Sequence, residues 1–142
     1  MSDSRILLVG CGKMGGAMLR GWLGRGLART DVRVVEPSAD AAAALRSELG
    51  IAVAGNLEDA AGDFSPDIIV FAVKPQGMDE IVPAYAGMAG NAVSLSIAAG
   101  RPISFFEKHL GASAAIVRAM PNTPAAVGRG ITAACANGQV SE

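Results

Sequence analysis

The chain has 142 residues, the usual size of one domain. Hydrophobic residues make up 51% of it and charged residues 18%, a composition that excludes intrinsic disorder. The 12 Lys and Arg residues and 13 Asp and Glu residues give a net charge of -1, so no basic excess favours nucleic acid or an anionic membrane as a partner.

The cysteines and the apolar runs bear on the compartment. The 2 cysteines, Cys11 and Cys135, lie near opposite ends of the chain, which is neither a disulfide framework nor a metal-ligand cluster. No apolar run approaches the ~18 residues of a membrane helix. The apolar run 6–9 is too short for a signal peptide core, and Lys13 follows it closely. We therefore expect a soluble, cytoplasmic protein.

The first predicted strand and helix lie at the N-terminus. Residues 5–9 predict a strand, in which residues 6–9 are apolar on both faces, as a central parallel strand requires. Apolar residues then recur at three- and four-residue steps from Met14 to Trp22, which predicts a helix. Gly24 and Gly26 are expected to end this helix.

Two further strand and helix pairs follow. Residues 32–35 predict a strand, and Ser38 is the expected N-cap of a helix that Gly50 closes. Residues 51–54 predict a short strand, and Asn56 is the expected N-cap of a short helix.

The remaining elements continue this alternation. The predicted strands are residues 67–73, 92–97, 114–117 and 131–135. A helical stretch that Pro83 starts or bends lies between the first two, and Pro102 is expected to open a helix that Gly111 ends. Strands that alternate with helices indicate a parallel sheet covered on both faces. The predicted fold class is therefore a doubly wound α/β domain.

The glycine-rich turn after the first strand carries the clearest chemical signal. In Gly10-Cys11-Gly12-Lys13-Met14-Gly15, the first glycine permits a tight turn and the second lets backbone approach a pyrophosphate. The third allows the helix to pack close to the sheet, with its first N–H groups aimed at the phosphates. The alternative is a plain glycine-rich turn, but the strand and helix context favours dinucleotide binding.

An acidic residue ends the second predicted strand. Glu36 follows Gly15 by 21 residues, close to the ~20 expected of a carboxylate that binds the adenosine ribose. Such a carboxylate would repel the 2′-phosphate of NADP. The alternative is a solvated acid at a strand end. Ser38 could touch that phosphate or serve only as a helix cap.

Two later segments are unusual for a general dinucleotide-binding domain. Ala72-Val73-Lys74-Pro75 brings a lysine to the carboxyl end of a strand, where open α/β sheets bind ligands. In the second segment, residues 118–124, two prolines stiffen a loop that displays Asn122 and Thr123. Either segment could instead be a rigid turn.

These motifs together resemble one enzyme family. The segments 9–15, 72–75, Ser96-Ile97-Ala98-Ala99-Gly100 and Arg118-Ala119-Met120-Pro121-Asn122-Thr123-Pro124 occur in the same order and spacing in pyrroline-5-carboxylate reductases. The resemblance covers nearly the whole chain. It implies a Rossmann-type domain that uses NADP(H) or NAD(H) in the reduction of 1-pyrroline-5-carboxylate to L-proline.

The resemblance also assigns residues by position. Those expected to hold the cofactor's phosphates are Val9, Gly10, Cys11, Gly12, Lys13, Met14 and Gly15. Those expected near the adenosine ribose are Glu36, Ser38 and, by a looser match, Asn56. Those expected beside the nicotinamide are Ala72, Val73, Lys74, Pro75, Ile97, Ala98 and Ala99. The candidate catalytic residues are Lys74, Asn122 and Thr123, although Lys74 could have only an electrostatic or packing role.

The chain also departs from the family. Members often prefer NADP and carry a small or polar residue where Glu36 stands, so the cofactor choice stays open. Members are about twice as long, and their second, helical domain forms a homo-oligomer and grips the substrate. Residues 1–142 are therefore expected to form only the dinucleotide-binding domain, with weak or no turnover alone. The alternatives are a non-catalytic dinucleotide-binding module and another imine or β-hydroxyacid dehydrogenase.

Overall fold

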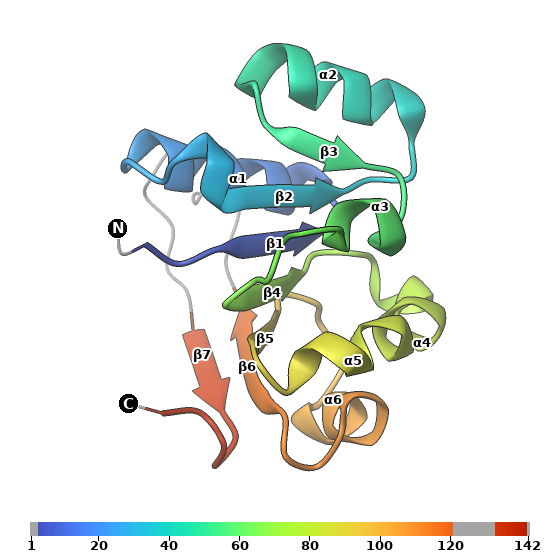
Figure 1. Ribbon diagram of the computed structural model, residues 1–142. Helices are drawn as coiled ribbons and strands as arrows, with labels where there is room; N and C mark the ends of the chain where they lie inside the picture. The colour runs from blue at the N-terminus through green and yellow to red at the C-terminus, as the bar shows by residue number, and fades with distance from the viewer. Residues whose placement is uncertain (1–2, 121–132, 142) are drawn as a thin grey trace.

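The computed structural model describes residues 3–120 and 133–141 (Figure 1). Its centre is a sheet of seven strands in the order β3-β2-β1-β4-β5-β6-β7. The strands are β1 (Ile6–Val9), β2 (Val32–Val35), β3 (Ala52–Ala54), β4 (Ile68–Phe71), β5 (Val93–Ser96), β6 (Ala115–Met120) and β7 (Ala133–Ala136). The first six run parallel, and β7 pairs with β6 in the antiparallel sense.

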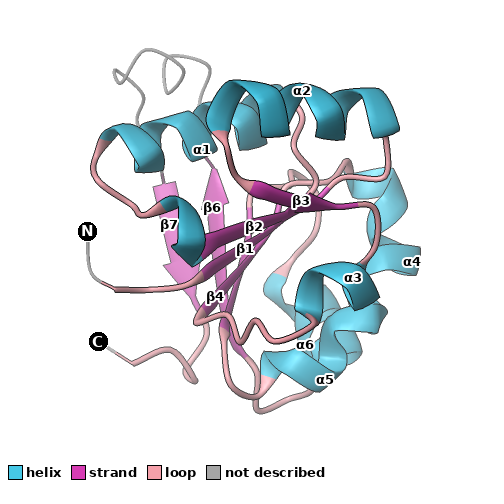
Figure 2. Cartoon of the chain, turned by 45° about the horizontal axis from the view of Figure 1, so that its top comes forward, coloured by secondary structure: helices cyan, strands magenta, loops and turns pink. Residues whose placement is uncertain are grey.

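Helices cover both faces of the sheet (Figure 2). The α-helices are α1 (Lys13–Gly24), α2 (Ala39–Leu49), α3 (Leu57–Ala61), α4 (Met78–Ile81), α5 (Ala86–Ala89) and α6 (Ile103–Leu110). The 3-10 turns are η1 (Arg29–Asp31), η2 (Pro75–Gly77) and η3 (Val82–Tyr85). Helices α1 and α2 pack on one face, and α3 to α6 pack on the other. The doubly wound arrangement predicted from the sequence is therefore confirmed.

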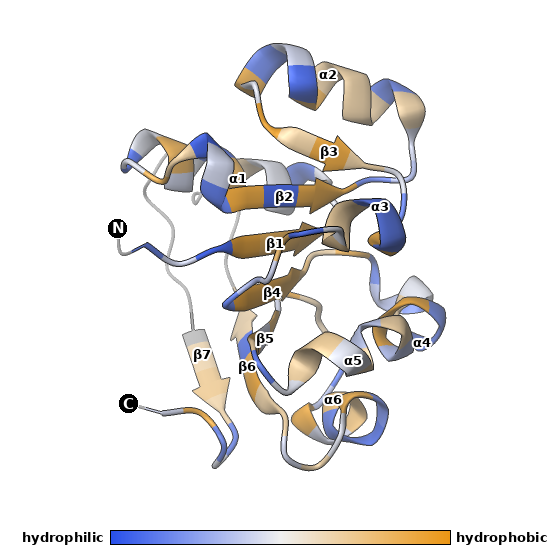
Figure 3. Cartoon of the chain, viewed as in Figure 1, coloured by the Kyte–Doolittle hydropathy of each residue, from blue (hydrophilic) through white to orange (hydrophobic). Residues whose placement is uncertain are grey.

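The core follows from the apolar strands. All four residues of β1 are buried, because the strand lies in the centre of the sheet with helices on both sides. The colouring of Figure 3 shows β1 and β4 as hydrophobic along their length, whereas α2 carries hydrophilic segments. Leu8 belongs to the core under α1 and α2, and Phe71 belongs to the core under α4 to α6.

The predicted helix caps are confirmed. The Ser38 hydroxyl accepts a hydrogen bond from the backbone N–H of Ala41 at 3.3 Å. The Asn56 side-chain oxygen accepts one from the N–H of Asp59 at 2.9 Å. These contacts satisfy donors that the first helical turn leaves without an intrahelical partner. Gly50 ends α2 with a φ of 65°, a left-handed conformation that favours glycine.

The segment between β4 and β5 differs from the expected helical stretch. It forms four short turns, η2, α4, η3 and α5, rather than one continuous helix. Pro83 lacks the N–H that a helix interior needs, so regular hydrogen bonding is interrupted there. Pro102 opens α6 as expected, from the N-cap position, and Gly111 ends the helix.

The C-terminal strands differ as well. Arg118 to Met120, expected in a loop, belong to β6, where Arg118 pairs with Ser96 of β5 and Cys135 of β7. Strand β7 confirms the predicted last strand over residues 133–135 and is antiparallel, while residues 131 and 132 lie outside the described residues. Pairing on both sides extends β6 beyond the apolar run that predicted it. Asn122 and Thr123 lie outside the described residues.

Candidate functional site

The predicted motifs meet where the strand order reverses. Strands β1 and β4 are neighbours, but the chain leaves them toward opposite faces of the sheet, and this switch point opens a crevice at the carboxyl ends of the strands. The N–H of Ala72 donates to the carbonyl of Val9 at 2.8 Å. The N–H of Ile97 donates to the carbonyl of Phe71 at 3.2 Å. The segments after β1, β4 and β5 therefore share one edge.

Two glycines of the turn after β1 have no room for a side chain. Gly10 has a φ of +84°, and a Cβ atom there would lie 2.7 Å from Cγ1 of Val73. A Cβ atom on Gly15 would lie 3.1 Å from the carbonyl oxygen of Gly10 and 3.2 Å from the Cβ of Ala72. Glycine at these positions lets the first turn of α1 lie directly against the loop and the end of β4.

The middle glycine of this turn faces open space instead. A Cβ atom on Gly12 would meet no atom within 4 Å. Gly12 is the N-cap of α1, and no side chain caps the helix there. The first N–H groups of α1, at exposed Lys13 and half-buried Met14, therefore begin beside an open position. This arrangement fits a phosphate group, since backbone donors and the positive end of the helix dipole point the same way.

Glu36 lies beside this turn, at the end of β2. Its N–H donates to the carbonyl of Ala54 at 2.8 Å, and its Oε2 accepts from the N–H of Ser38 at 3.1 Å. Burial raises the pKa of the Cys11 thiol, and the negative charge of Glu36 raises it further. The Glu36 carboxylate is therefore oriented by the backbone after it, and its charge acts on the Cys11 thiol of the glycine-rich turn.

Asn56 has a structural role in these contacts. Its side-chain oxygen caps α3, and its side-chain nitrogen donates to Asp59 at 3.0 Å. Both polar atoms thus have partners inside α3. Asn56 is nevertheless exposed and close to the carboxyl end of β3, which pairs with β2.

An apolar pocket of about 190 Å³ lies under the crevice. It is lined by Val9, Val35, Pro37, Leu57, Val73, Ile81, Ala84 and Tyr85. Burial raises the pKa of Tyr85 to about 12, so this phenol is protonated at neutral pH. The segment after β4 and the carboxyl ends of β1 and β2 together form an apolar surface that suits a flat, weakly polar ring.

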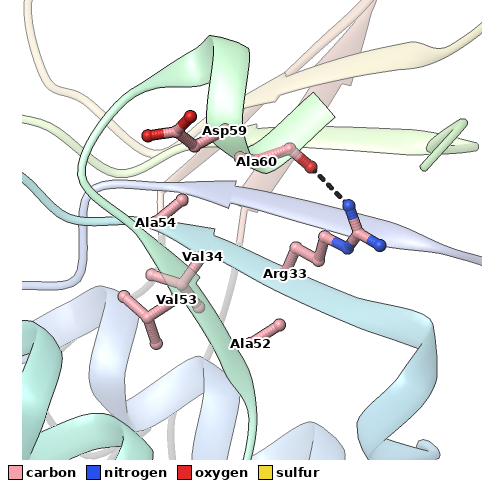
Figure 4. A pocket seen from close by; sticks show the side chains of 7 residues that line it. All are labelled: Arg33, Val34, Ala52, Val53, Ala54, Asp59 and Ala60. Atoms are coloured by element: carbon pink, nitrogen blue, oxygen red, sulfur yellow. Dashed lines mark hydrogen bonds between the residues drawn. The ribbon is translucent and has the colours of Figure 1, made fainter. Parts of the chain in front are cut away.

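Another pocket, of about 100 Å³, lies between β2, β3 and α3 (Figure 4). Its polar side chains are Arg33 and Asp59. Arg33 donates to the carbonyl of Ala60 at 2.8 Å and to Asp63 at 2.7 Å. The Arg33 guanidinium also lies 4.8 Å from the ring centroid of Phe64. Arg33 therefore anchors α3 to the sheet.

The Lys74 and Pro75 segment is held by a residue that the sequence did not single out. Arg101 donates to the carbonyl of Pro75 through Nε at 3.2 Å and Nη2 at 2.9 Å. It also pairs with Asp79 at 3.0 Å and lies 4.8 Å from the ring centroid of Phe105. Lys74 is exposed at this edge. No local pattern predicts this anchor, because its partner lies 26 residues away in the chain.

The third predicted segment completes the edge. Ile97 follows β5, and the Ser96 hydroxyl accepts from the N–H of Ala98 at 3.2 Å, which turns the chain at once. Ala98 is buried and Ala99 is exposed. The structure thus brings together the predicted residues after β1, β2, β4 and β5.

Residues 3–120 and 133–141 contain no group of His, Cys, Asp and Glu side chains that could hold a metal ion. Over the same residues, no helix has both the length and the apolar character needed to cross a bilayer.

The sheet order, the crossover at β1 and β4 and the glycine-rich turn define a Rossmann-type α/β domain. Residues 5–100 match the family described as NADP oxidoreductase, coenzyme F420-dependent. The chain belongs to this family.

Individual relatives give a narrower likeness. The chain is 35% identical over 142 residues to pyrroline-5-carboxylate reductase of Pseudomonas aeruginosa, covering 99% of this chain and 51% of that protein. The structure of a pyrroline-5-carboxylate reductase from Coxiella burnetii matches with a TM-score of 0.92 at 28% identity, covering 99% of this chain and 52% of the other. The Plasmodium falciparum pyrroline carboxylate reductase with NADP bound matches with a TM-score of 0.84 at 27% identity, covering 99% and 51%.

The resemblance seen in the motifs is thereby confirmed. The chain spans about half the length of the relatives it matches.

Proposed function

We propose that residues 1–142 form a dinucleotide-binding domain that holds NAD(H) or NADP(H) for the reduction of 1-pyrroline-5-carboxylate to L-proline. The observation that carries the proposal is the glycine-rich turn. Neighbouring atoms crowd the position of a Cβ atom at Gly10 and Gly15, whereas Gly12 faces open space at the start of α1. A plain βα turn does not need this combination, but a turn that holds a pyrophosphate does.

The proposed contacts follow the edge of the sheet. The backbone of residues 9–15 holds the pyrophosphate, with α1 directed at it. Glu36 accepts hydrogen bonds from the adenosine ribose, and Ser38 and Asn56 lie near it. The adenine fits the apolar pocket that Val73 and Tyr85 help to line.

The segments after β4 and β5 form the nicotinamide side. Residues 72–75 and 97–99 restrict the position of the ring, and Arg101 fixes the first of these segments through Pro75. The bound dinucleotide supplies a hydride, which leaves the protein to bind and orient the reactants and to exclude water. Lys74 is proposed to act electrostatically at this edge, and Asn122 and Thr123 to border the substrate.

The substrate class rests on two observations. Residues 72–75, 96–100 and 118–124 carry motifs that resemble those of pyrroline-5-carboxylate reductases. The Pseudomonas aeruginosa and Coxiella burnetii relatives bear that name. A protonated cyclic imine is already electrophilic at carbon, so its reduction needs no strong general base. The nicotinamide side of the crevice matches this requirement, since residues 72–75 and 97–99 offer backbone groups, apolar side chains and one exposed lysine, Lys74.

We also propose a cytoplasmic location, a homo-oligomeric full-length protein and a small-molecule partner only. The location is supported by the cysteines Cys11 and Cys135, which are both unpaired, as in proteins of a reducing compartment. Cell fractionation and sedimentation of the full-length protein test the first two proposals.

The function is tested by binding and by turnover. Isothermal titration of the 142-residue chain with NADH and NADPH should show binding of at least one dinucleotide. Oxidation of that dinucleotide by 1-pyrroline-5-carboxylate is then followed at 340 nm with the chain alone. The assay is repeated with the chain fused to the part of the Pseudomonas aeruginosa relative that it does not span.

The outcomes test different parts of the proposed function. Binding together with imine-dependent oxidation by the fusion supports the whole proposal. Binding without oxidation by the fusion leaves a dinucleotide-binding module and rejects the substrate. Absence of binding by a chain that circular dichroism shows to be folded rejects the proposed function altogether.

A further inference from the structure

We propose that this site selects NAD(H) over NADP(H), and that Glu36 and Asp40 are the residues that reject the 2′-phosphate. The inference rests on the proposed dinucleotide function and specifies its cofactor. It concerns the end of β2 and the start of α2, the region that lies beside the adenosine ribose in a Rossmann-type domain.

Glu36 is held in a defined position at the end of β2. Its backbone N–H is tied to Ala54, and its Oε2 is held by the N–H of Ser38, so the carboxylate has a defined direction. Its charge acts on the Cys11 thiol in the glycine-rich turn. A carboxylate between this turn and α2 can accept hydrogen bonds from both ribose hydroxyls. A 2′-phosphate in the same place would set two negative groups in contact.

Two backbone donors at the start of α2 are already engaged. The N–H of Ser38 donates to the Glu36 carboxylate, and the N–H of Ala41 donates to the Ser38 hydroxyl. A helix start that bound phosphate would keep such donors open. Exposed Asp40 in the first turn adds a second negative charge.

Residues 36–45 contain no Lys or Arg, and Arg46 donates to the carbonyl of Val53 at 2.7 Å. Arg20 acts on the same Cys11 thiol, but Glu48 holds it with two hydrogen bonds of 2.8 and 2.9 Å. Both of these arginines are therefore engaged. Within residues 36–45, a 2′-phosphate would meet two carboxylates and no cationic side chain.

The test is direct binding, measured with the 142-residue chain. Isothermal titration with NADH and with NADPH gives the ratio of the dissociation constant of NADPH to that of NADH. We expect NADH to bind at least about tenfold more tightly. The variant Glu36→Ser should lower this ratio about tenfold, and Asp40→Asn should lower it by a smaller factor. Because the repulsion is electrostatic, the ratio for the unmodified chain should also fall as salt is raised.

A matched control removes one charge from the other end of β2. Asp31→Asn changes the net charge as Asp40→Asn does, but it lies at the amino end of the strand. It should leave the ratio unchanged.

The outcomes separate the two proposals. Equal or tighter binding of NADPH by the unmodified chain overturns the selectivity and leaves the dinucleotide function standing. A ratio that Glu36→Ser does not change overturns the role of Glu36. Absence of binding by either dinucleotide to the folded chain overturns the proposed function, and the selectivity with it.

Discussion

A hydrogen bond of 2.9 Å from the N–H of Gly10 to the carbonyl of Val35 ties the turn after β1 to the end of β2. This bond holds Gly10 at a φ of +84°, with Val73 packed against the position of a Cβ atom. Two residues later, Gly12 faces open space. One short turn therefore contains a glycine that the fold requires and another that only a ligand would require.

Gly10→Ala is expected to destabilise the fold. The left-handed conformation alone costs an alanine roughly 1–2 kcal/mol, and the contact with Val73 adds to this cost. Urea denaturation followed by circular dichroism measures the loss. Gly21→Ala in α1, where a Cβ atom meets nothing within 4 Å, is the control and should stabilise the chain slightly. A Gly10→Ala variant as stable as the unmodified chain would contradict the geometry of the turn.

Gly12→Ser should separate binding from stability. Serine is a favoured N-cap, and the new side chain would enter space that the protein leaves empty, so stability should be unchanged or slightly higher. The same side chain would occupy the proposed phosphate position and its donors. We expect NADH affinity, measured by isothermal titration, to fall at least about tenfold. Unchanged affinity would place the pyrophosphate elsewhere.

The sequence predicted the sheet, the first three helices and their caps well, because these depend on local patterns. Ser38 and Asn56 act as caps from positions that can be read directly. The sequence did not predict the features that depend on contacts between residues far apart in the chain. Arg118 joins β6 because β7 pairs with it from the far side, and Arg101 holds Pro75 across 26 residues.

Part of the candidate site could be predicted because it, too, depends on local patterns. The glycine-rich turn and Glu36 follow strands that the sequence defines, so their meeting at one edge follows from a parallel sheet. The orientation of the Glu36 carboxylate depends on its bond with Ser38, which no sequence pattern specifies.

Asp63→Asn should reduce stability in a pH-dependent way. The hydrogen bond from Arg33 lowers the pKa of the Asp63 carboxyl. A lowered carboxyl pKa stabilises the fold at pH values above ~3.9, the unfolded value, and this contribution is lost as pH falls through the folded value. The variant should have a slightly lower Tm at pH 7, and the difference should disappear in acid. Glu80→Gln, an exposed acid on α4, is the charge control. A Tm difference that stays constant down to acid pH would exclude the ion pair as its cause.

Arg101→Lys should loosen the segment after β4. Lysine keeps the charge but cannot place two donors on the Pro75 carbonyl as Arg101 does. Hydrogen exchange at the N–H of Gly77, which bonds to the Lys74 carbonyl at 3.0 Å, should become faster. NADH affinity should fall several-fold, while the Tm should change little. The control variant Arg25→Lys should change neither the exchange at Gly77 nor the NADH affinity. Unchanged exchange at Gly77 would show that the segment holds its shape without Arg101.

Cys11 provides a chemical probe of the charge at Glu36. Burial, and next the Glu36 carboxylate, raise the pKa of the Cys11 thiol, so less of the reactive thiolate is present at a given pH. In a Cys135→Ser background, alkylation of Cys11 by iodoacetamide should still be accelerating above pH ~8.5, the ordinary cysteine value. Glu36→Gln removes the negative charge, so it should shift this pH profile downward and speed alkylation at pH 8.

The matched control for this experiment is Glu58→Gln, which removes an exposed acid from the first turn of α3 and should leave the profile in place. NADH should slow alkylation in the chain that retains Glu36, because the bound pyrophosphate would cover the turn that contains Cys11. If Glu36→Gln leaves the profile where it was, the Glu36 charge does not act on Cys11 in the glycine-rich turn in solution. In that event the ribose contact and the rejection of the 2′-phosphate both lose their structural basis.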